Sequence, residues 1–115
     1  MALEPAIHEE PIISPSTSLG NGITVKKQGD IVFIERDTAT TVSRASAGWI
    51  EVCTLPAEYK PKRDIRFVGI DNGAPTQGQI SVLCAIDSST GKLSAYVFAD
   101  RLTIALGFCI SYILA

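Results

Sequence analysis

Apolar and polar residues alternate with a period of two along most of the chain after its first twenty residues, which is typical of strands with one buried face. Ile23 and Val25 alternate with polar neighbours, a turn follows at 28–30, and the alternation resumes over 31–35. Residues 23–35 are therefore predicted to form a β-hairpin. Similar runs predict further strands at 38–42, 49–55, 65–70, 79–86, 92–98, 102–106 and 108–114.

Turn signals separate these runs at intervals of roughly 8–12 residues, and no segment carries a convincing helical period. Pro56 and Pro61 bracket a corner between two strands, because neither proline can donate an amide to a ladder. Ile80, Val82 and Cys84 are predicted to share one face of their strand. The pattern predicts an all-β domain, namely a compact antiparallel β-barrel or jelly-roll-like sandwich of about 7–9 short strands.

The start of the chain is rich in proline, serine and threonine and contains no alternating run. Pro5, Pro11 and Pro15 remove amide donors and favour an extended backbone. The segment is also acidic, unlike the basic start of a secretory signal peptide. We expect an N-terminal arm or linker over residues 1–21 and a β head domain over residues 22–115.

The apolar share of the chain is high for one small domain. Apolar residues make up 46% and charged residues only 19% of the 115 residues, so part of the apolar surface should lie at a contact and we expect an oligomer. The excess is greatest in 102–115, which is too short to span a bilayer as a helix. This stretch is predicted to be a strand pair buried on both faces. The Pro-Ile-Ile segment at 11–13 could add along a neighbouring chain.

Charge and histidine content argue against several classes of function. The net charge is −2, and the chain lacks the basic footprint that a nucleic-acid binder normally needs. The single histidine, His8, lies in the predicted arm, so neither a histidine-based catalytic site nor a multi-histidine zinc site is expected. No cofactor motif is present, and we expect no cofactor.

The cysteines Cys53, Cys84 and Cys109 are far apart in sequence, and each has apolar or β-branched neighbours. No pair has the close spacing of a metal or redox motif. We expect all three to be buried thiols, in keeping with folding in a reducing cytosol.

Four cations, Lys60, Lys62, Arg63 and Arg66, lie within seven residues of one another. Such a cluster can bind a phosphate or an acidic polysaccharide through charge-assisted hydrogen bonds. It can also be a solvated corner loop that binds nothing. The sequence leaves both interpretations open.

Aromatic side chains and acids near turns supply the other candidates. Trp49 could stack on a sugar face, but a tryptophan that opens a strand is more often part of the core. Tyr59 leaves the same choice open, and Tyr96 would share a face with Phe98. Four acids lie beside predicted turns, where Asp usually bonds its own backbone; they are Asp64, Asp71, Asp87 and Asp100. The candidate ligand-binding residues are Trp49, Tyr59, Lys60, Lys62, Arg63 and Asp71, and no catalytic or metal-binding residue is predicted.

The segment Leu55-Pro-Ala-Glu-Tyr-Lys-Pro61 between two predicted strands has a distinctive spacing. It resembles the head domains of receptor-binding and tail-fibre tip proteins of phages that infect Gram-positive bacteria, including those of lactococcal phages. Lys26–Val32 looks like the hairpin that opens such heads, and Ile86–Gly91 looks like their late hairpin. The resemblance covers about residues 22–115.

This resemblance implies a trimeric β head that binds host cell-wall saccharides, often phosphorylated, near the grooves between protomers. It implies a protein of the virion, at a tail tip or fibre, folded in the host cytoplasm and without membrane insertion. The arm would contact other tail or baseplate proteins, or be a strand exchanged between chains. One departure is that Leu83 and Ala85 stand where those heads carry a His-x-Asp pair that touches the sugar. The ligand residues of the family therefore do not carry over.

Three functions remain in view. The first is a virion adhesin that binds a surface glycan without catalysis, with avidity from several copies. The second is a structural trimerisation or capping module of a fibre or baseplate, with no ligand of its own. The third is a small enzyme or lectin of cellular origin, which would need features such as two carboxylates about 5 Å apart in a cleft.

Overall fold

The computed structural model describes residues 16–73 and 80–114, and this part of the chain is all-β, as predicted. A short 3-10 helix, Ala57–Tyr59, occupies the predicted proline corner. The strands are β1 Thr17–Gly20, β2 Ile23–Gln28, β3 Ile31–Arg36, β4 Val42–Ser43, β5 Gly48–Thr54, β6 Ile65–Asp71, β7 Ile80–Ile86, β8 Lys92–Val97, β9 Thr103–Ile104 and β10 Leu106–Ile113.

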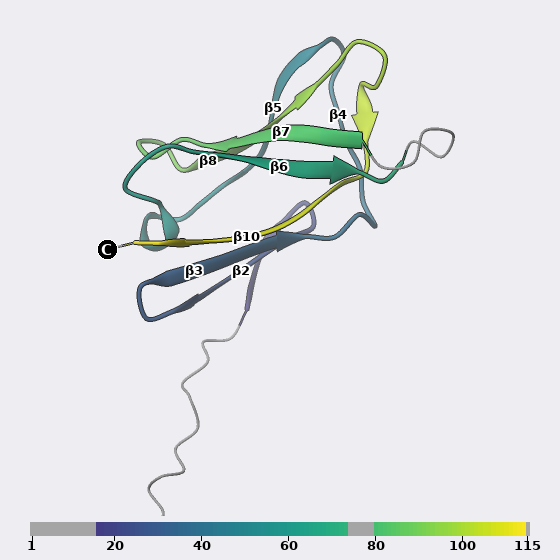
Figure 1. Cartoon of the computed structure of the whole chain (residues 1–115). Helices are drawn as coiled ribbons and strands as arrows, with labels where there is room; N and C mark the ends of the chain where they lie inside the picture. The colour runs from purple at the N-terminus through teal and green to yellow at the C-terminus, as the bar shows by residue number, and fades with distance from the viewer. Residues whose placement is uncertain (1–15, 74–79, 115) are drawn as a thin grey trace, which may run out of the picture.

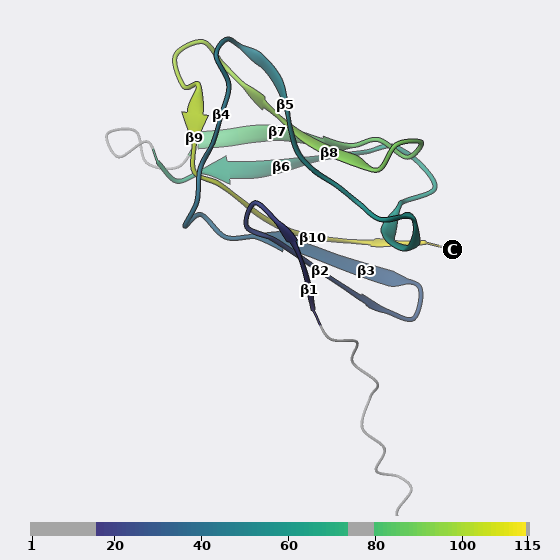
Figure 2. The ribbon, with the colours of Figure 1, turned by 180° about the vertical axis from the view of Figure 1, so that it is seen from behind.

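Eight strands form one antiparallel sheet in the order β1-β2-β3-β10-β6-β7-β8-β5, and the sheet curls until it is nearly closed into a barrel. β10 runs between the β2–β3 hairpin and β6, so the end of the chain joins the two halves of the sheet (Figure 1). β4 and β9 pair separately and lie side by side at one end (Figure 2). The barrel alternative of the sequence prediction is therefore the closer description.

The sheet opens at two places where neighbouring strands diverge. β7 pairs with β8 only through Cys84–Ile86, and β10 pairs with β6 only at Leu106 and Gly107. β6 and β7 pair along their whole length, from Ile65 to Asp71. It follows that the β7–β8 fork opens at the Asp71 end of the sheet and the β6–β10 fork opens at the opposite, Ile65 end.

The edge strands β1 and β5 approach each other, and a side-chain hydrogen bond joins the two edges of the sheet there. β5 has a bulge between Glu51 and Cys53, which leaves Val52 outside the regular register. The Asn21 side-chain amide, from the turn between β1 and β2, donates to the Val52 carbonyl at 2.8 Å. Asn21 has φ 54°, a left-handed conformation that asparagine tolerates better than most residues.

Arg36, at the end of β3, is 2% exposed and holds this region together. Its guanidinium donates to the Asn21 carbonyl at 2.7 Å, to the Leu106 carbonyl at 2.6 Å, and to the carbonyl and hydroxyl of Thr40 at 3.1 and 3.0 Å. One side chain thus joins the β1–β2 turn, the loop after β3 and the start of β10.

The prediction that the C-terminal stretch forms a strand pair is wrong. β9 pairs with β4 instead of β10, and β10 is a single strand whose later residues are alternately exposed. Cys109, Ser111 and Ile113 face outward because no second layer of the described chain covers that face of the sheet. Cys109 is therefore exposed, contrary to prediction, whereas Cys53 and Cys84 are buried as predicted. Burial raises the pKa of both buried thiols to about 11.

Two predicted boundaries also shift. The sheet begins at Thr17, so the last part of the predicted arm forms β1, while residues 1–15 lie outside the described residues. The strand expected at 38–42 begins only at Val42, because Asp37 accepts a hydrogen bond from the Ala39 amide and makes a turn.

Replacing the buried guanidinium tests its structural role. Arg36→Met should lower the free energy of unfolding by about 3 kcal/mol, because acceptors on Asn21, Thr40 and Leu106 lose their donor. Urea unfolding followed by circular dichroism measures this change. Arg44→Met is the matched control, since Arg44 is exposed and also donates to backbone carbonyls. Equal losses in the two variants would contradict the assigned role.

Candidate functional site

Three aromatic side chains lie together on the outer face of β5 and β8. Trp49 of β5 pairs with Tyr96 of β8, and their rings meet edge-on with centroids 5.5 Å apart. Phe98, just after β8, meets Tyr96 in the same manner at 5.1 Å. Trp49 is 40% exposed and Phe98 is 55% exposed. We call Trp49, Tyr96 and Phe98 the aromatic row.

The row points outward because β8 directs its other face into the core. Leu93, Ala95 and Val97 are buried, and the strand period then places Tyr96 and Phe98 on the opposite face. This confirms that Tyr96 and Phe98 share a face. The expectation that Trp49 belongs to the core is wrong.

A cation and two aliphatic side chains extend this surface. The Arg66 guanidinium lies 5.6 Å from the centroid of the Trp49 ring, in a cation–π contact that fixes one side of the indole. Val68 of β6 and Leu83 of β7 pair across the sheet and are 63% and 44% exposed. Apolar side chains therefore lie on the outer face of four neighbouring strands.

The β7–β8 fork contains a cleft of about 270 Å³ beside the aromatic row. Tyr96 and Phe98 belong to the aromatic row and also line the cleft, so the two features form one continuous surface. The cleft has mostly apolar walls and a few polar groups, a composition common in ligand sites. Its remaining lining residues are Asp71, Ile80, Ser81, Val82, Val97, Asp100, Arg101 and Ile104.

An ion pair between a buried carboxylate and a half-buried guanidinium lies in this cleft. Asp71 is 1% exposed, and the Arg101 guanidinium donates to its Oδ2 at 2.7 and 2.8 Å. The amides of Gly73 and Ala105 donate to its Oδ1 at 2.9 and 3.0 Å. Burial alone would raise the pKa of Asp71, but these amides and Arg101 outweigh it and hold that pKa below its ordinary value. The carboxylate therefore stays charged and orients Arg101.

The other predicted ligand-binding residues lie near the opposite end of the sheet. Tyr59 is buried at 9% exposure, and its carbonyl accepts a hydrogen bond from the Tyr112 hydroxyl. The Lys60 ammonium donates to the Ser89 carbonyl at 3.0 Å. The predicted set therefore divides into two regions, with Trp49 and Asp71 in one.

Lys62 and Arg63 belong to the second region, since both are exposed and line a shallow groove in the β6–β10 fork. The Leu55–Pro61 motif, which contains Tyr59 and Lys60, is a structural corner here. Leu55 is 2% exposed, and its amide donates to the Gly91 carbonyl at 2.8 Å.

The prediction that the acids near turns bond their own backbone is confirmed only in part. The Ser89 hydroxyl and the amides of Thr90 and Ser89 lower the pKa of Asp87 to about 2, which is local turn chemistry. Asp64 instead accepts hydrogen bonds from the amide and hydroxyl of Ser88, which joins two loops.

Sequence reasoning did not select Arg101 or Phe98 as candidates. Arg101 lies thirty positions from Asp71, and no local pattern signals their pairing. Phe98 could have been found from the two-residue spacing to Tyr96.

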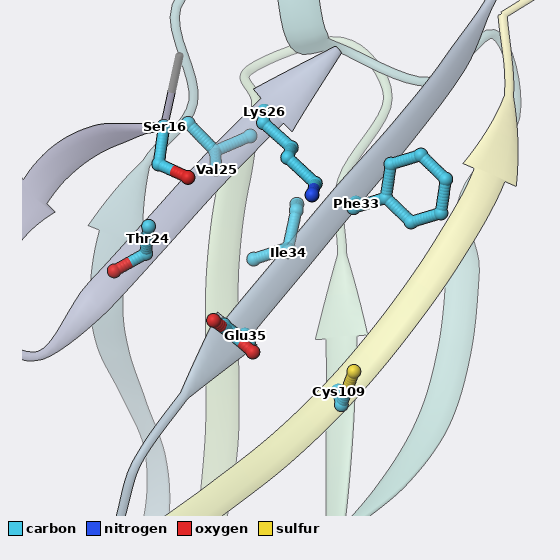
Figure 3. Close-up of a pocket in the computed structure, with 8 residues that line it drawn as sticks. All are labelled: Ser16, Thr24, Val25, Lys26, Phe33, Ile34, Glu35 and Cys109. Carbon is cyan, nitrogen blue, oxygen red and sulfur yellow. The ribbon is translucent and has the colours of Figure 1, made fainter. Parts of the chain in front are cut away.

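A second surface groove, of about 200 Å³, lies on the outer face of β2, β3 and β10 (Figure 3). The Lys26 ammonium is 5.6 Å from the centroid of the Phe33 ring, and Glu35 and Cys109 lie further along the groove. The groove contains one partly exposed aromatic side chain, in contrast to the three of the aromatic row. Phe33 therefore provides a matched comparison for the row.

No model of a known protein family matches the chain, and no curated protein matches it. Within residues 16–73 and 80–114, no group of three or more His, Cys, Asp or Glu side chains is placed to hold a metal ion. The same residues include no helix that is long and apolar enough to cross a membrane.

The Asp71–Arg101 pair predicts a pH dependence of stability. Because the folded pKa of Asp71 is lowered, its contribution should be complete above the unfolded pKa of about 4 and be lost as the pH falls through the folded pKa. Asp71→Asn should cost about 2 kcal/mol at pH 7 and progressively less in acid. Urea titrations from pH 2 to 7 measure the difference.

Asp100→Asn is the control, because Asp100 is an exposed carboxylate on the same cleft. A constant difference between Asp71→Asn and the parent across this pH range would refute the assigned ion pair.

Proposed function

We propose that this domain is a non-catalytic adhesin head that binds a saccharide of a host cell surface. The observation that carries the proposal is the aromatic row, in which Trp49 and Phe98 are exposed beside the cleft of the β7–β8 fork. Aromatic rings present a flat apolar face with a polarised edge, and the C–H groups of a sugar ring pack against such faces. Trp49 and Phe98 are the rings of the row that are exposed enough to take such a contact.

The polar groups around the row also suit a saccharide. Arg66 beside Trp49 and Arg101 at the cleft supply donors for hydroxyl or acidic substituents. Arg101 is held by Asp71, so little side-chain entropy remains to be lost when a ligand binds. Binding is therefore favoured by a surface that is already in place.

The burial and hydrogen bonding of the acids in the cleft favour a binding function over a catalytic one. Asp71 is buried and accepts hydrogen bonds at both carboxylate oxygens, which makes it a poor proton donor or nucleophile. Asp100 is the other carboxylate that lines the cleft. A pair of free carboxylates, as glycoside hydrolysis requires, is therefore not assembled from these two groups.

The phage setting of this proposal comes from the resemblance of Leu55–Pro61 to phage head domains. In that setting the domain forms a homotrimer in the virion, and residues 1–21 contact other tail or baseplate proteins. Weak binding at each site would be strengthened by several copies acting together.

A structural trimerisation or capping module is the second candidate, favoured by the exposure of Val68 and Leu83. Aliphatic side chains of this kind are typical of a protein contact.

For a structural module, the double variant Val68→Ser/Leu83→Ser should lower the mass measured by light scattering from that of a trimer to that of a monomer. A parent chain that is monomeric throughout would contradict both candidates in their trimeric form.

Truncating the aromatic row tests the adhesin proposal. Trp49→Ala and Phe98→Ala should each weaken binding of purified host cell-wall polysaccharide by about tenfold, as expected for the loss of about 1.4 kcal/mol of ring contact. Isothermal titration calorimetry measures the affinity. Phe33→Ala is the control, since it removes a partly exposed ring from the other groove. The proposal fails if both row variants bind like the parent, or if Phe33→Ala is equally impaired.

A further inference from the structure

Asp100 is a carboxylate of the β7–β8 cleft that has no structural partner. The Arg101 amide donates to the Phe98 carbonyl at 2.9 Å, and the tight turn so formed contains Asp100 in an exposed position. The other three acids beside predicted turns each accept at least one backbone amide. Asp100 accepts no hydrogen bond and forms no ion pair within residues 16–73 and 80–114. Its charge is therefore free to meet a ligand.

The charges that line the cleft do not cancel. Arg101 donates to Oδ2 of Asp71 at 2.7 and 2.8 Å, so its positive charge is already matched. The lining side chains other than Asp71, Asp100 and Arg101 are uncharged. Residues 74–79, which connect β6 to β7, contain no charged residue either. The cleft therefore keeps one unmatched negative charge, and an acidic substituent of a ligand is better placed beside Arg66, outside the cleft.

Two aromatic rings lie in the same cleft as this carboxylate. The Tyr96 and Phe98 rings are 5.1 Å apart at an angle of 60°, and both line the cleft. The negative face of an aromatic ring attracts a cation, most strongly where water is partly excluded. The cleft thus combines an unpaired carboxylate with two rings, and both kinds of group favour a positively charged ligand.

The polar groups favour a primary ammonium among such cations. The Ser81 hydroxyl is exposed in the cleft and can accept a hydrogen bond, as can the carboxylate of Asp100. A primary ammonium has three N–H donors, so it can bond to both acceptors and still meet a ring face. A neutral acetamido group has one N–H donor and no charge. The volume of the cleft, about 270 Å³, is just below the roughly 300–1,000 Å³ of typical ligand pockets and suits a single sugar unit.

We propose that the β7–β8 cleft binds a sugar unit with a free amino group, whose ammonium lies between Asp100 and the rings of Tyr96 and Phe98. This inference rests on the proposed saccharide function and names the class of saccharide, an amino sugar that is not N-acetylated. Asp100 selects the charge of the sugar, and the rest of the saccharide follows the aromatic row toward Trp49.

Two monosaccharides that differ at the amino group test the proposal. The full chain, labelled with ¹⁵N, is titrated with D-glucosamine or with N-acetyl-D-glucosamine at pH 6, where the free amine is protonated, and at equal ionic strength. Amide chemical shifts of Phe98–Arg101 report binding in the cleft. D-Glucosamine should bind with a Kd about tenfold lower, as expected for one exposed ion pair together with a cation–π contact.

Asp100→Asn should reduce this preference to about threefold, because the ring contact remains while the ion pair is lost. Asp100 is exposed and makes no contact that the fold requires, so the variant should fold like the parent. Glu58→Gln is the matched control, since it removes one exposed carboxylate outside the cleft and changes the net charge equally. It should keep the full tenfold preference.

Equal affinities for the two sugars, an unchanged preference in Asp100→Asn, or an equal loss in Glu58→Gln would each overturn the amino-sugar assignment. The assignment also fails if neither sugar shifts the amides of Phe98–Arg101. If both sugars bind equally and Phe98→Ala weakens both, the adhesin proposal stands and this assignment alone is wrong. If neither sugar nor host cell-wall polysaccharide binds, the proposed function fails with it.

Discussion

The buried guanidinium of Arg36 is the interaction on which the rest of the structure depends. A buried charge is costly unless all of its donors are engaged, and here the acceptors come from three separate segments. The side chain is satisfied only when the β1–β2 turn, the loop after β3 and the start of β10 are all in place. Through Asn21 it also reaches the bulge of β5, so closure of the barrel is coupled to the same site.

Two short strand pairings, β10 with β6 and β7 with β8, decide where the grooves of the sheet arise. Leu106 accepts from Arg36 and also begins the short pairing with β6, after which β10 follows β3. The β6–β10 fork follows from this path, whereas the β7–β8 fork at the opposite end follows from the short pairing of β7 with β8. One fork lies beside the aromatic row and the Asp71–Arg101 pair, whereas the other is lined by Ile113 and by the exposed Lys62 and Arg63. The two ends of this sheet therefore carry grooves of different chemical character.

Much of the fold is visible in the sequence, because the two-residue period marks each hairpin and groups Ile80, Val82 and Cys84 on one face. The period does not say whether the opposite face is covered, and for this reason Trp49 and Cys109 are exposed against expectation. Nor does it give the pairing of distant strands, so the forks and the partnership of Asp71 with Arg101 could not be predicted. The candidate set therefore contained Trp49 but omitted Phe98 beside it.

Trp49 is the only tryptophan in the chain, and it lies in the proposed binding surface with Arg66 beside it. The most direct measurement is therefore a titration of the parent protein with purified host cell-wall polysaccharide, followed by intrinsic tryptophan fluorescence. The account predicts a saturable change in emission as sugar rings cover the indole. Binding detected by calorimetry with no change in tryptophan emission would contradict it, because the ligand would then occupy a different surface.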